Sequence, residues 1–166
     1  MSRIESRTLY TLNELAPDAR QKAIDENRYF NTEFMEWWDG VYMDAEDIGL
    51  KITSFDLGRR SSCEGRFTQS GEDVAKAIIA MAGPDCETVA TAEAFLKALA
   101  ALPLEDGEEC PSDDDLEDCE KEFLHSLLED YRIMLERECE WLESDESVAE
   151  SLECNGMEFL EDGSNP

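Results

Sequence analysis

Residues 113–144 carry the longest helical pattern in the chain. Apolar side chains recur there at helical spacing in two neighbouring stripes, which together make a wide apolar face. The stripes are Leu124, Leu128, Tyr131, Leu135 and Leu142 beside Leu116, Phe123, Leu127, Met134 and Trp141. Pro111 precedes the pattern, and Ser112 followed by Asp115 resembles a capping box. The pattern predicts one long amphipathic helix, laid on a core, that ends near Ser144.

The N-terminal part mixes strand and helix patterns. Residues 6–12 alternate and are β-prone, which predicts a strand. Proline suits the first turn of a helix, so a helix is expected from Pro17. A second helix is expected from about Asn31 to the natural stop at Gly49.

The middle of the chain predicts a hairpin and two helices. An alternating segment at 50–57 and a return strand from Cys63 form the expected β-hairpin. Two short helices follow, separated by Gly83 and Pro84, and their many alanines favour close helix packing.

The C-terminal end predicts a short capped helix at 144–154, a last strand at 157–160 and a frayed end at 161–166. The whole pattern is α+β: one small antiparallel sheet of about three to four strands, packed with helices. We expect an α+β core at 1–102, an acidic linker loop at 103–112, and a part at 113–166 that completes the same domain.

The charge of the chain is strongly negative and uneven. There are 42 Asp and Glu against 14 Lys and Arg, a net charge of −28, and residues 101–166 alone hold 24 acids and 3 bases. Self-repulsion of this size opposes a compact state, so the excess calls for an explanation. Nucleic acid and anionic membranes are disfavoured as direct partners. Cations and basic surfaces of other proteins are favoured.

Thiol usage and hydropathy indicate a cytoplasmic protein. The N-terminus lacks the apolar region of a signal peptide, and no apolar run approaches ~18–20 residues. No C-x-x-C occurs, so reduced thiols are favoured over a disulfide framework. The six cysteines are Cys63, Cys86, Cys110, Cys119, Cys139 and Cys154.

Metal ligands do not occur in a recognisable arrangement. Zinc would need four Cys or His ligands in close pairs, whereas Cys110, Cys119 and His125 stand apart. The EF-hand loop pattern fails when it is started from Asp106 or from Asp113. We expect no metal ion and no cofactor.

Catalytic motifs do not occur either. The single histidine leaves little choice of base for a nucleophilic triad, and no phosphate-cradling glycine loop is present. We expect a protein without enzymatic activity. An enzyme that uses paired carboxylates stays open, because any two of the 42 acids could pair.

Two smaller features admit two interpretations each. Trp37 and Trp38 would point about 100° apart on a helix, so one belongs to the core and the other to its margin or to an interface. Arg59, Arg60 and Arg66, in the hairpin at 58–66, either balance the acidic helix or tune the binding of a partner.

The linear charge density of the acidic helix is close to that of nucleic acid. Residues 113–146 contain 15 acids and 3 bases. Their net charge amounts to about one per 4 Å of helix, whereas one DNA strand carries a phosphate about every 3.4 Å. A solvated outer helix face is the alternative, but it predicts mixed signs. This surface therefore favours a Lys- and Arg-lined groove as its partner.

Four segments resemble a widespread family of uncharacterised phage and prophage proteins: "TLYTLNELAPDARQKAIDENRYFN", "WWDGVYMDAEDIGLKITSFDL", "CEGRFT" and "SDESVAESLECNGMEFLEDG". Many members have a Ser-Gln-Gly-Asp-Gly-type segment in the hairpin, where this chain has "LGRRSSCEG". The shared motifs are structural and carry no catalytic residues. The resemblance implies a mobile-element origin and, by analogy with other small acidic phage proteins, inhibition of host defence.

We therefore expect a phage-encoded inhibitor, of anti-CRISPR or anti-restriction type, that acts in the cytoplasm of the infected host by DNA mimicry. Its expected partner-binding residues are Trp37, Glu105, Asp106, Glu108, Glu109, Asp113, Asp114, Asp115, Glu117, Asp118, Glu120, Glu122 and the outward acids Glu129, Asp130, Glu136, Glu140 and Glu143. The alternative is an antitoxin-like or scaffolding module that binds through an apolar face at Trp37 and Trp38. A homodimer also stays open.

Overall fold

The computed structural model describes residues 2–33, 36–104, 107 and 109–166. The predicted α+β class is confirmed. In chain order the elements are β1 (Tyr10–Thr11), the 3-10 turn η1 (Leu12–Glu14), α1 (Pro17–Glu26), α2 (Phe30–Glu33), α3 (Asp39–Asp47), β2 (Leu50–Asp56), β3 (Ser62–Phe67), α4 (Gly71–Met81), α5 (Glu87–Ala100), α6 (Asp113–Leu142), α7 (Asp145–Cys154) and β4 (Glu158–Phe159). The four strands form two separate antiparallel pairs, β1 with β4 and β2 with β3, rather than one sheet.

The chain divides into two compact units with separate cores. Unit 1 comprises residues 1–37 and 137–166, and unit 2 comprises residues 38–136. These limits differ from the boundaries at 102 and 112 that we expected. The long helix α6 begins in unit 2, and its last six residues belong to unit 1.

Unit 1 joins the two ends of the chain. Strand β1 pairs with β4, so that Tyr10 lies opposite Phe159. The expected strand at 6–12 is shorter than predicted, because only the two residues that face β4 have a partner. A fully buried Phe159 packs with apolar side chains of α1 and α7. The core of unit 1 consists of Leu12, Leu15, Ala23, Ile24, Val148, Ala149, Leu152 and Phe159.

The C-terminal tail is docked on α1, and the prediction of a frayed end is wrong. Gly163 is buried and donates its N–H to Leu160 in a tight turn with a positive φ of 90°. Lys22 of α1 pairs with Asp162 at 3.3 Å. A local turn and contacts to a distant helix therefore order a segment whose composition is typical of a loose end.

Substitution of Gly163 by alanine should destabilise the protein by more than about 2 kcal/mol. An added Cβ would meet the backbone oxygen and carbon of Ala19, and the residue also needs a left-handed backbone. Gly156→Ala is the matched control: Gly156 has a φ of 63° but open space around its Cβ position, so about 1 kcal/mol is expected. Urea denaturation measures both, and equal losses would contradict the role of the close approach.

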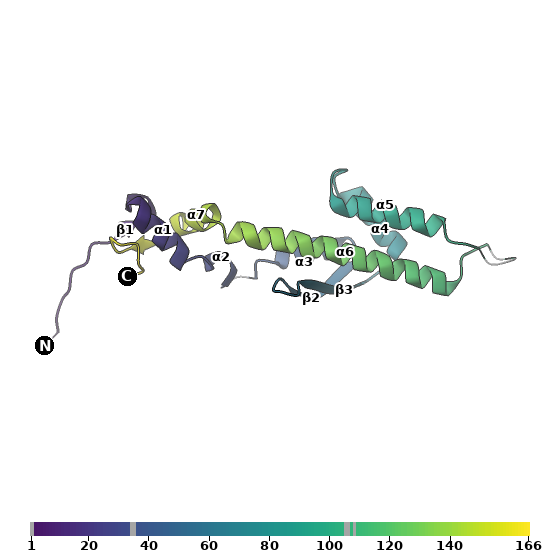
Figure 1. Cartoon of the computed structure of the whole chain (residues 1–166), viewed down its shortest axis with the longest axis horizontal. Helices are drawn as coiled ribbons and strands as arrows, with labels where there is room; N and C mark the ends of the chain where they lie inside the picture. The colour runs from purple at the N-terminus through teal and green to yellow at the C-terminus, as the bar shows by residue number, and fades with distance from the viewer. Residues whose placement is uncertain (1, 34–35, 105–106, 108) are drawn as a thin grey trace. The chain divides into compact units, whose positions relative to one another are not determined.

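Unit 2 is built around α6. The β2–β3 hairpin pairs Leu50 with Phe67, and the α4–α5 helix pair lies across α6 from it (Figure 1). Phe123 of α6 stacks on Phe95 of α5 with 4.3 Å between ring centroids, and its ring centroid lies 5.3 Å from that of Phe67. The core of unit 2 therefore contains side chains from both sides of α6.

The expected helix from Asn31 to Gly49 is not continuous, and that prediction is wrong. Helix α2 ends at Glu33 and α3 begins at Asp39, with Trp37 and Trp38 in a turn before α3. Trp38 packs edge-on against Phe55 of β2, with 5.7 Å between ring centroids. The Trp-Trp-Asp-Gly sequence has only a weak preference for helix, and the packing of Trp38 on Phe55 prevails over it. The predicted stop at Gly49 is confirmed by its φ of 89°.

Candidate functional site

The start of α6 is fixed by a side-chain cap. Ser112 accepts a hydrogen bond from the backbone N–H of Asp115 at 3.2 Å, as the capping pattern predicts. Asp113, Asp114 and Asp115 follow in the first turn, where carboxylates complement the positive end of the helix dipole. The predicted helix is confirmed, and it ends at Leu142.

An acidic stripe runs along the exposed side of the first turns of α6. It consists of Asp114, Asp118 and Glu122, which recur every four residues and are all exposed. Successive members are separated by about 6 Å along the helix axis. Lys121, next to the stripe, is engaged by Glu117 at 3.1 Å. Among the described residues, no cation forms an ion pair with a member of the stripe.

Two of the expected partner-binding acids serve the packing of unit 2. Glu120 accepts a hydrogen bond from the backbone N–H of Gly71, at the start of α4. Asp130 is half-buried and accepts a hydrogen bond from the Thr91 hydroxyl of α5. Burial raises the pKa of Asp130 above its ordinary value. The expectation that Asp130 points outward is therefore wrong, because it faces α5.

Two further acids are partly neutralised by one arginine. Arg132 lies between Glu129 and Glu136, at 2.6 Å and 2.8 Å, with a side chain that is only 15% exposed. It also donates a hydrogen bond to Ser61, in the turn of the β2–β3 hairpin. The guanidinium lowers the pKa of Glu129. This part of α6 has the mixed charges of an ordinary solvated face.

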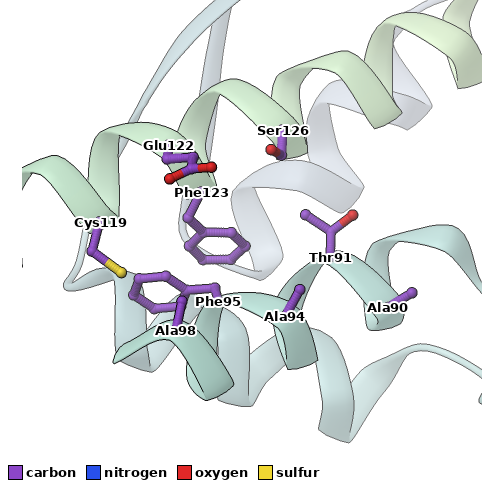
Figure 2. Close-up of a pocket in the computed structure, with 9 residues that line it drawn as sticks. All are labelled: Ala90, Thr91, Ala94, Phe95, Ala98, Cys119, Glu122, Phe123 and Ser126. Carbon is purple, nitrogen blue, oxygen red and sulfur yellow. The ribbon is translucent and has the colours of Figure 1, made fainter. Parts of the chain in front are cut away.

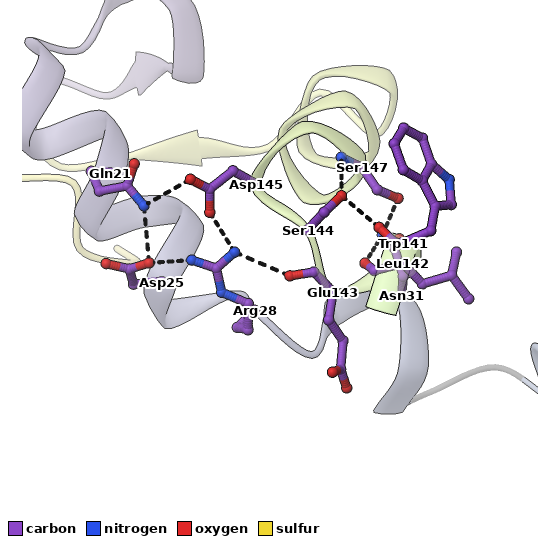
Figure 3. A network of polar contacts seen from close by, with 10 residues as sticks. All are labelled: Gln21, Asp25, Arg28, Asn31, Trp141, Leu142, Glu143, Ser144, Asp145 and Ser147. Atoms are coloured by element: carbon purple, nitrogen blue, oxygen red, sulfur yellow. Dashed lines mark hydrogen bonds and ion pairs between the residues drawn. The ribbon is translucent and has the colours of Figure 1, made fainter. Parts of the chain in front are cut away.

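The end of α6 belongs to a polar network in unit 1 (Figure 3). Arg28 donates to the backbone oxygen of Glu143 and pairs with Asp145, and the pKa of Asp145 is lowered by this contact. Asn31 donates to the backbone oxygen of Leu142 at 2.9 Å. The Glu143 carboxylate is half-buried and accepts from Thr32, so its expected outward position is wrong as well.

The remaining expected residues differ in how far the structure describes them. Glu109 and Glu140 are exposed. Trp37 is half-buried in the turn before α3. Glu105, Asp106 and Glu108 lie outside the described residues. Their part in partner binding stays a prediction, as it does for the other acids.

The three hairpin arginines are exposed. Arg59 and Arg60 lie in the turn between β2 and β3, and Arg66 lies on β3. Within the described parts of the chain, none of the three forms an ion pair. Both interpretations of the hairpin, charge balance of the acidic helix and contact with a partner, stay open.

A groove of about 370 Å³ lies between α5 and α6 (Figure 2). Its floor includes the stacked rings of Phe95 and Phe123, and Glu122 of the acidic stripe lines it from α6. Ala90, Ala94 and Ala98 line it from α5 and are exposed. Close packing of the α4–α5 pair uses other alanines instead, Ala75 and Ala92, which are fully buried. The groove was not predicted, although Ala90, Ala94 and Ala98 recur every four residues.

Asp130→Asn should leave the protein at least as stable at pH 7 as the wild type. The pKa of Asp130 is raised in the folded state, so this carboxyl favours folding at low pH and opposes it increasingly as the pH rises through that pKa. The Thr91 hydroxyl can still donate to the amide oxygen of asparagine. Urea denaturation between pH 3 and pH 7 should show the advantage of the variant shrinking toward pH 3, and a growing advantage would contradict it. Asp118→Asn, exposed on the same helix, is the control.

Within the described residues, no group of three or more His, Cys, Asp or Glu could hold a metal ion. The six cysteines are free thiols, and burial raises the pKa of Cys63 and of Cys139 to about 11. In that part of the chain, none of the helices has the length and apolarity needed to cross a membrane.

The fold and the charge distribution define an acidic α+β protein whose distinctive surface is the start of α6. Comparison with models of known protein families finds no match, and neither curated proteins nor solved structures match the chain.

Proposed function

We propose that the chain is a phage-encoded acidic inhibitor that binds a basic, nucleic-acid-binding surface of a host defence protein. The observation that carries the proposal is the exposed acidic stripe at the start of α6, which forms no ion pair within the described residues. In this proposal the stripe occupies the place of nucleic acid on a CRISPR effector or restriction complex. The partner is a protein, and no direct contact with nucleic acid or membrane is involved.

The stripe costs stability, which supports a role outside folding. Like charges four residues apart on a helix destabilise it by about 0.2–0.5 kcal/mol per pair. The dipole of α6 offsets this cost for the acids of the first turn, but its influence fades beyond that turn. Asp118 and Glu122 lie beyond the first turn, so the fold alone does not account for them.

The charge density also supports the proposal. Residues 113–122 hold seven acids and one base. Over about 15 Å of helix this is roughly one net charge per 2.5 Å, between the density of one DNA strand and that of the duplex. A Lys- and Arg-lined groove would release counterions on binding such a surface, as it does on binding nucleic acid.

The groove between α5 and α6 adds an apolar contact beside the charge. Glu122 belongs both to the stripe and to the wall of the groove. A partner that places a basic side chain on the stripe can therefore bury an apolar side chain against Phe95 or Phe123. This combination favours a shaped protein surface over a diffuse layer of counterions.

An interference assay tests the proposal. The chain is expressed in bacteria that carry one CRISPR or restriction system each, and the plating efficiency of a targeted phage is measured. We expect plating to be restored for at least one system. Purified effector should then bind DNA less well in the presence of the chain. Normal DNA binding by every effector tested would overturn the proposal.

The alternative of an antitoxin-like or scaffolding module makes an opposite prediction. Binding through the aromatic turn would be nearly insensitive to salt and lost in Trp37→Ala. Trp37 is half-buried, so it offers less free surface than the stripe. The salt dependence of affinity separates the two functions.

A further inference from the structure

A second pocket of about 300 Å³ lies within unit 2. It shares no lining residue with the α5–α6 groove. Asp44 and Asp47 of α3 line it and are exposed. Ile48 and Ile78 form apolar walls and are buried. We refer to this cavity as the α3–α4 pocket. Its volume, at the lower end for ligand sites, suits one side chain rather than a large ligand.

Two residues whose hydroxyl groups have no hydrogen-bond partner among the described residues line this pocket. Thr88 and Tyr131 line it and are only 7% and 6% exposed. Within the described residues, neither side chain makes a hydrogen bond. No fully enclosed side-chain oxygen of the described residues lacks a partner, so both hydroxyl oxygens keep some accessible surface. Buried hydroxyls normally find a partner in the protein, so this pair points to a ligand or to water.

The hydroxyl of Tyr131 is an acceptor over the whole physiological pH range. Burial, with a smaller contribution from the carboxylates of Asp44 and Asp130, raises the pKa of Tyr131 to about 12. The phenol therefore stays neutral and keeps a lone pair for a donor. Asp44 and Asp47 line the same pocket, and the carboxylate of Asp44 acts electrostatically on the phenol.

The chemistry of the lining selects one class of ligand. The two carboxylates repel anions, and within the described residues no group of three or more His, Cys, Asp or Glu could hold a metal ion. An ammonium group has three N–H donors and no acceptor. The apolar stem that carries such a group packs well on apolar walls.

We propose that the α3–α4 pocket binds an alkylammonium group, with Asp44 and Asp47 pairing with its charge, Tyr131 and Thr88 accepting its N–H groups, and the alkyl stem lying against Ile48 and Ile78. A lysine side chain of a protein partner and a free polyamine both present this chemistry. The lysine source rests on the proposed function, whereas ammonium binding itself does not.

The test is a titration of the full chain with small molecules, monitored through the NMR chemical shifts of the backbone amides. The probes are Nα-acetyl-lysine amide, spermidine, the neutral Nα-acetyl-norleucine amide, and tetramethylammonium, which has no N–H donor. We expect saturable shifts at Asp44, Asp47, Ile78 and Tyr131 with the first two probes only. Equal shifts with tetramethylammonium or norleucine amide, or shifts spread over all acidic surfaces, would overturn the proposal.

Variants assign the interaction to the pocket. Asp44→Asn with Asp47→Asn should weaken binding at least about tenfold, and Tyr131→Phe about threefold or more. Glu46→Gln with Glu93→Gln makes the same change of charge at exposed positions of unit 2 outside the pocket lining, and it should bind as the wild type does. Loss of binding in this control would overturn the assignment. Thermal unfolding checks that each variant is folded.

These experiments distinguish the two sources of the ammonium group. Together with the inhibition assay, they also distinguish the pocket from the proposed function. Tighter binding of spermidine assigns the pocket to free polyamines, and equal or tighter binding of lysine amide assigns it to a partner's lysine. Failure of inhibition with intact amine binding would reject the proposed function alone. Inhibition without amine binding would reject only the pocket.

Discussion

Reversal of the acidic stripe to lysine, as Asp114→Lys, Asp118→Lys and Glu122→Lys, should abolish inhibition and weaken binding to the host effector by at least about 100-fold. Placing like charges against each other across an interface costs several kcal/mol, which is about two to three powers of ten in affinity. The three side chains are exposed and make no ion pair within the described residues, so the fold should survive. The effector's DNA-binding assay with added chain measures the effect.

The control for this reversal changes the net charge by the same amount in unit 1. Glu150, Glu153 and Glu161 are exposed, and their replacement by lysine should leave inhibition within about threefold of the wild type. Retained inhibition in the stripe variant would reject DNA mimicry by α6. Equal loss in both variants would show that net charge matters and the stripe does not.

The salt dependence of binding affinity tests the role of the acidic stripe independently. The logarithm of affinity should fall linearly with the logarithm of salt concentration, because binding releases counterions. The stripe variant should show a shallower slope than the wild type, whereas the unit 1 control should keep the wild-type slope. A flat salt response of the wild type would favour the apolar alternative at Trp37.

Phe123→Ala should destabilise the protein by about 3–5 kcal/mol, because it removes a buried aromatic ring and leaves a cavity. Phe123 is only 3% exposed and contacts rings from both sides of α6, namely Phe95 and Phe67. The loss therefore affects the packing of the helix pair and of the hairpin together. Urea denaturation with a fitted m-value measures it.

Phe123→Leu is the control for this loss. Leucine restores most of the apolar volume, so a smaller loss of about 1–1.5 kcal/mol is expected. Hydrogen exchange should place the loss of protection in unit 2. An alanine variant that loses less than about 1 kcal/mol would show that the aromatic cluster is not the centre of that core.

Local patterns predicted most elements well. The cap at Ser112, the stop at Gly49 and the start of α1 at Pro17 depend on neighbours in sequence, and the structure confirms all three. The amphipathic pattern also included all the residues of α6 that are buried, although Trp141, placed on the same face, is exposed. These features are local because capping, backbone conformation and helical periodicity are set within a few residues.

Features that depend on distant partners were predicted poorly. The β-prone segment at 6–12 forms a strand only where β4 lies beside it, and the tail is ordered only because Gly163 approaches α1 closely. The helix over 31–49 is interrupted where Trp38 packs on Phe55. Each correction comes from a contact between residues far apart in sequence.

The same distinction applies to the candidate site. By itself the sequence determined that α6 is long, amphipathic and highly acidic, since composition and period suffice for that. Only the tertiary structure decided how the acids divide: Glu120 and Asp130 accept hydrogen bonds from α4 and α5, Arg132 neutralises two others, and the stripe stays exposed. The reason is physical, because a carboxylate's environment is set by the elements that pack around it and not by its neighbours along the helix.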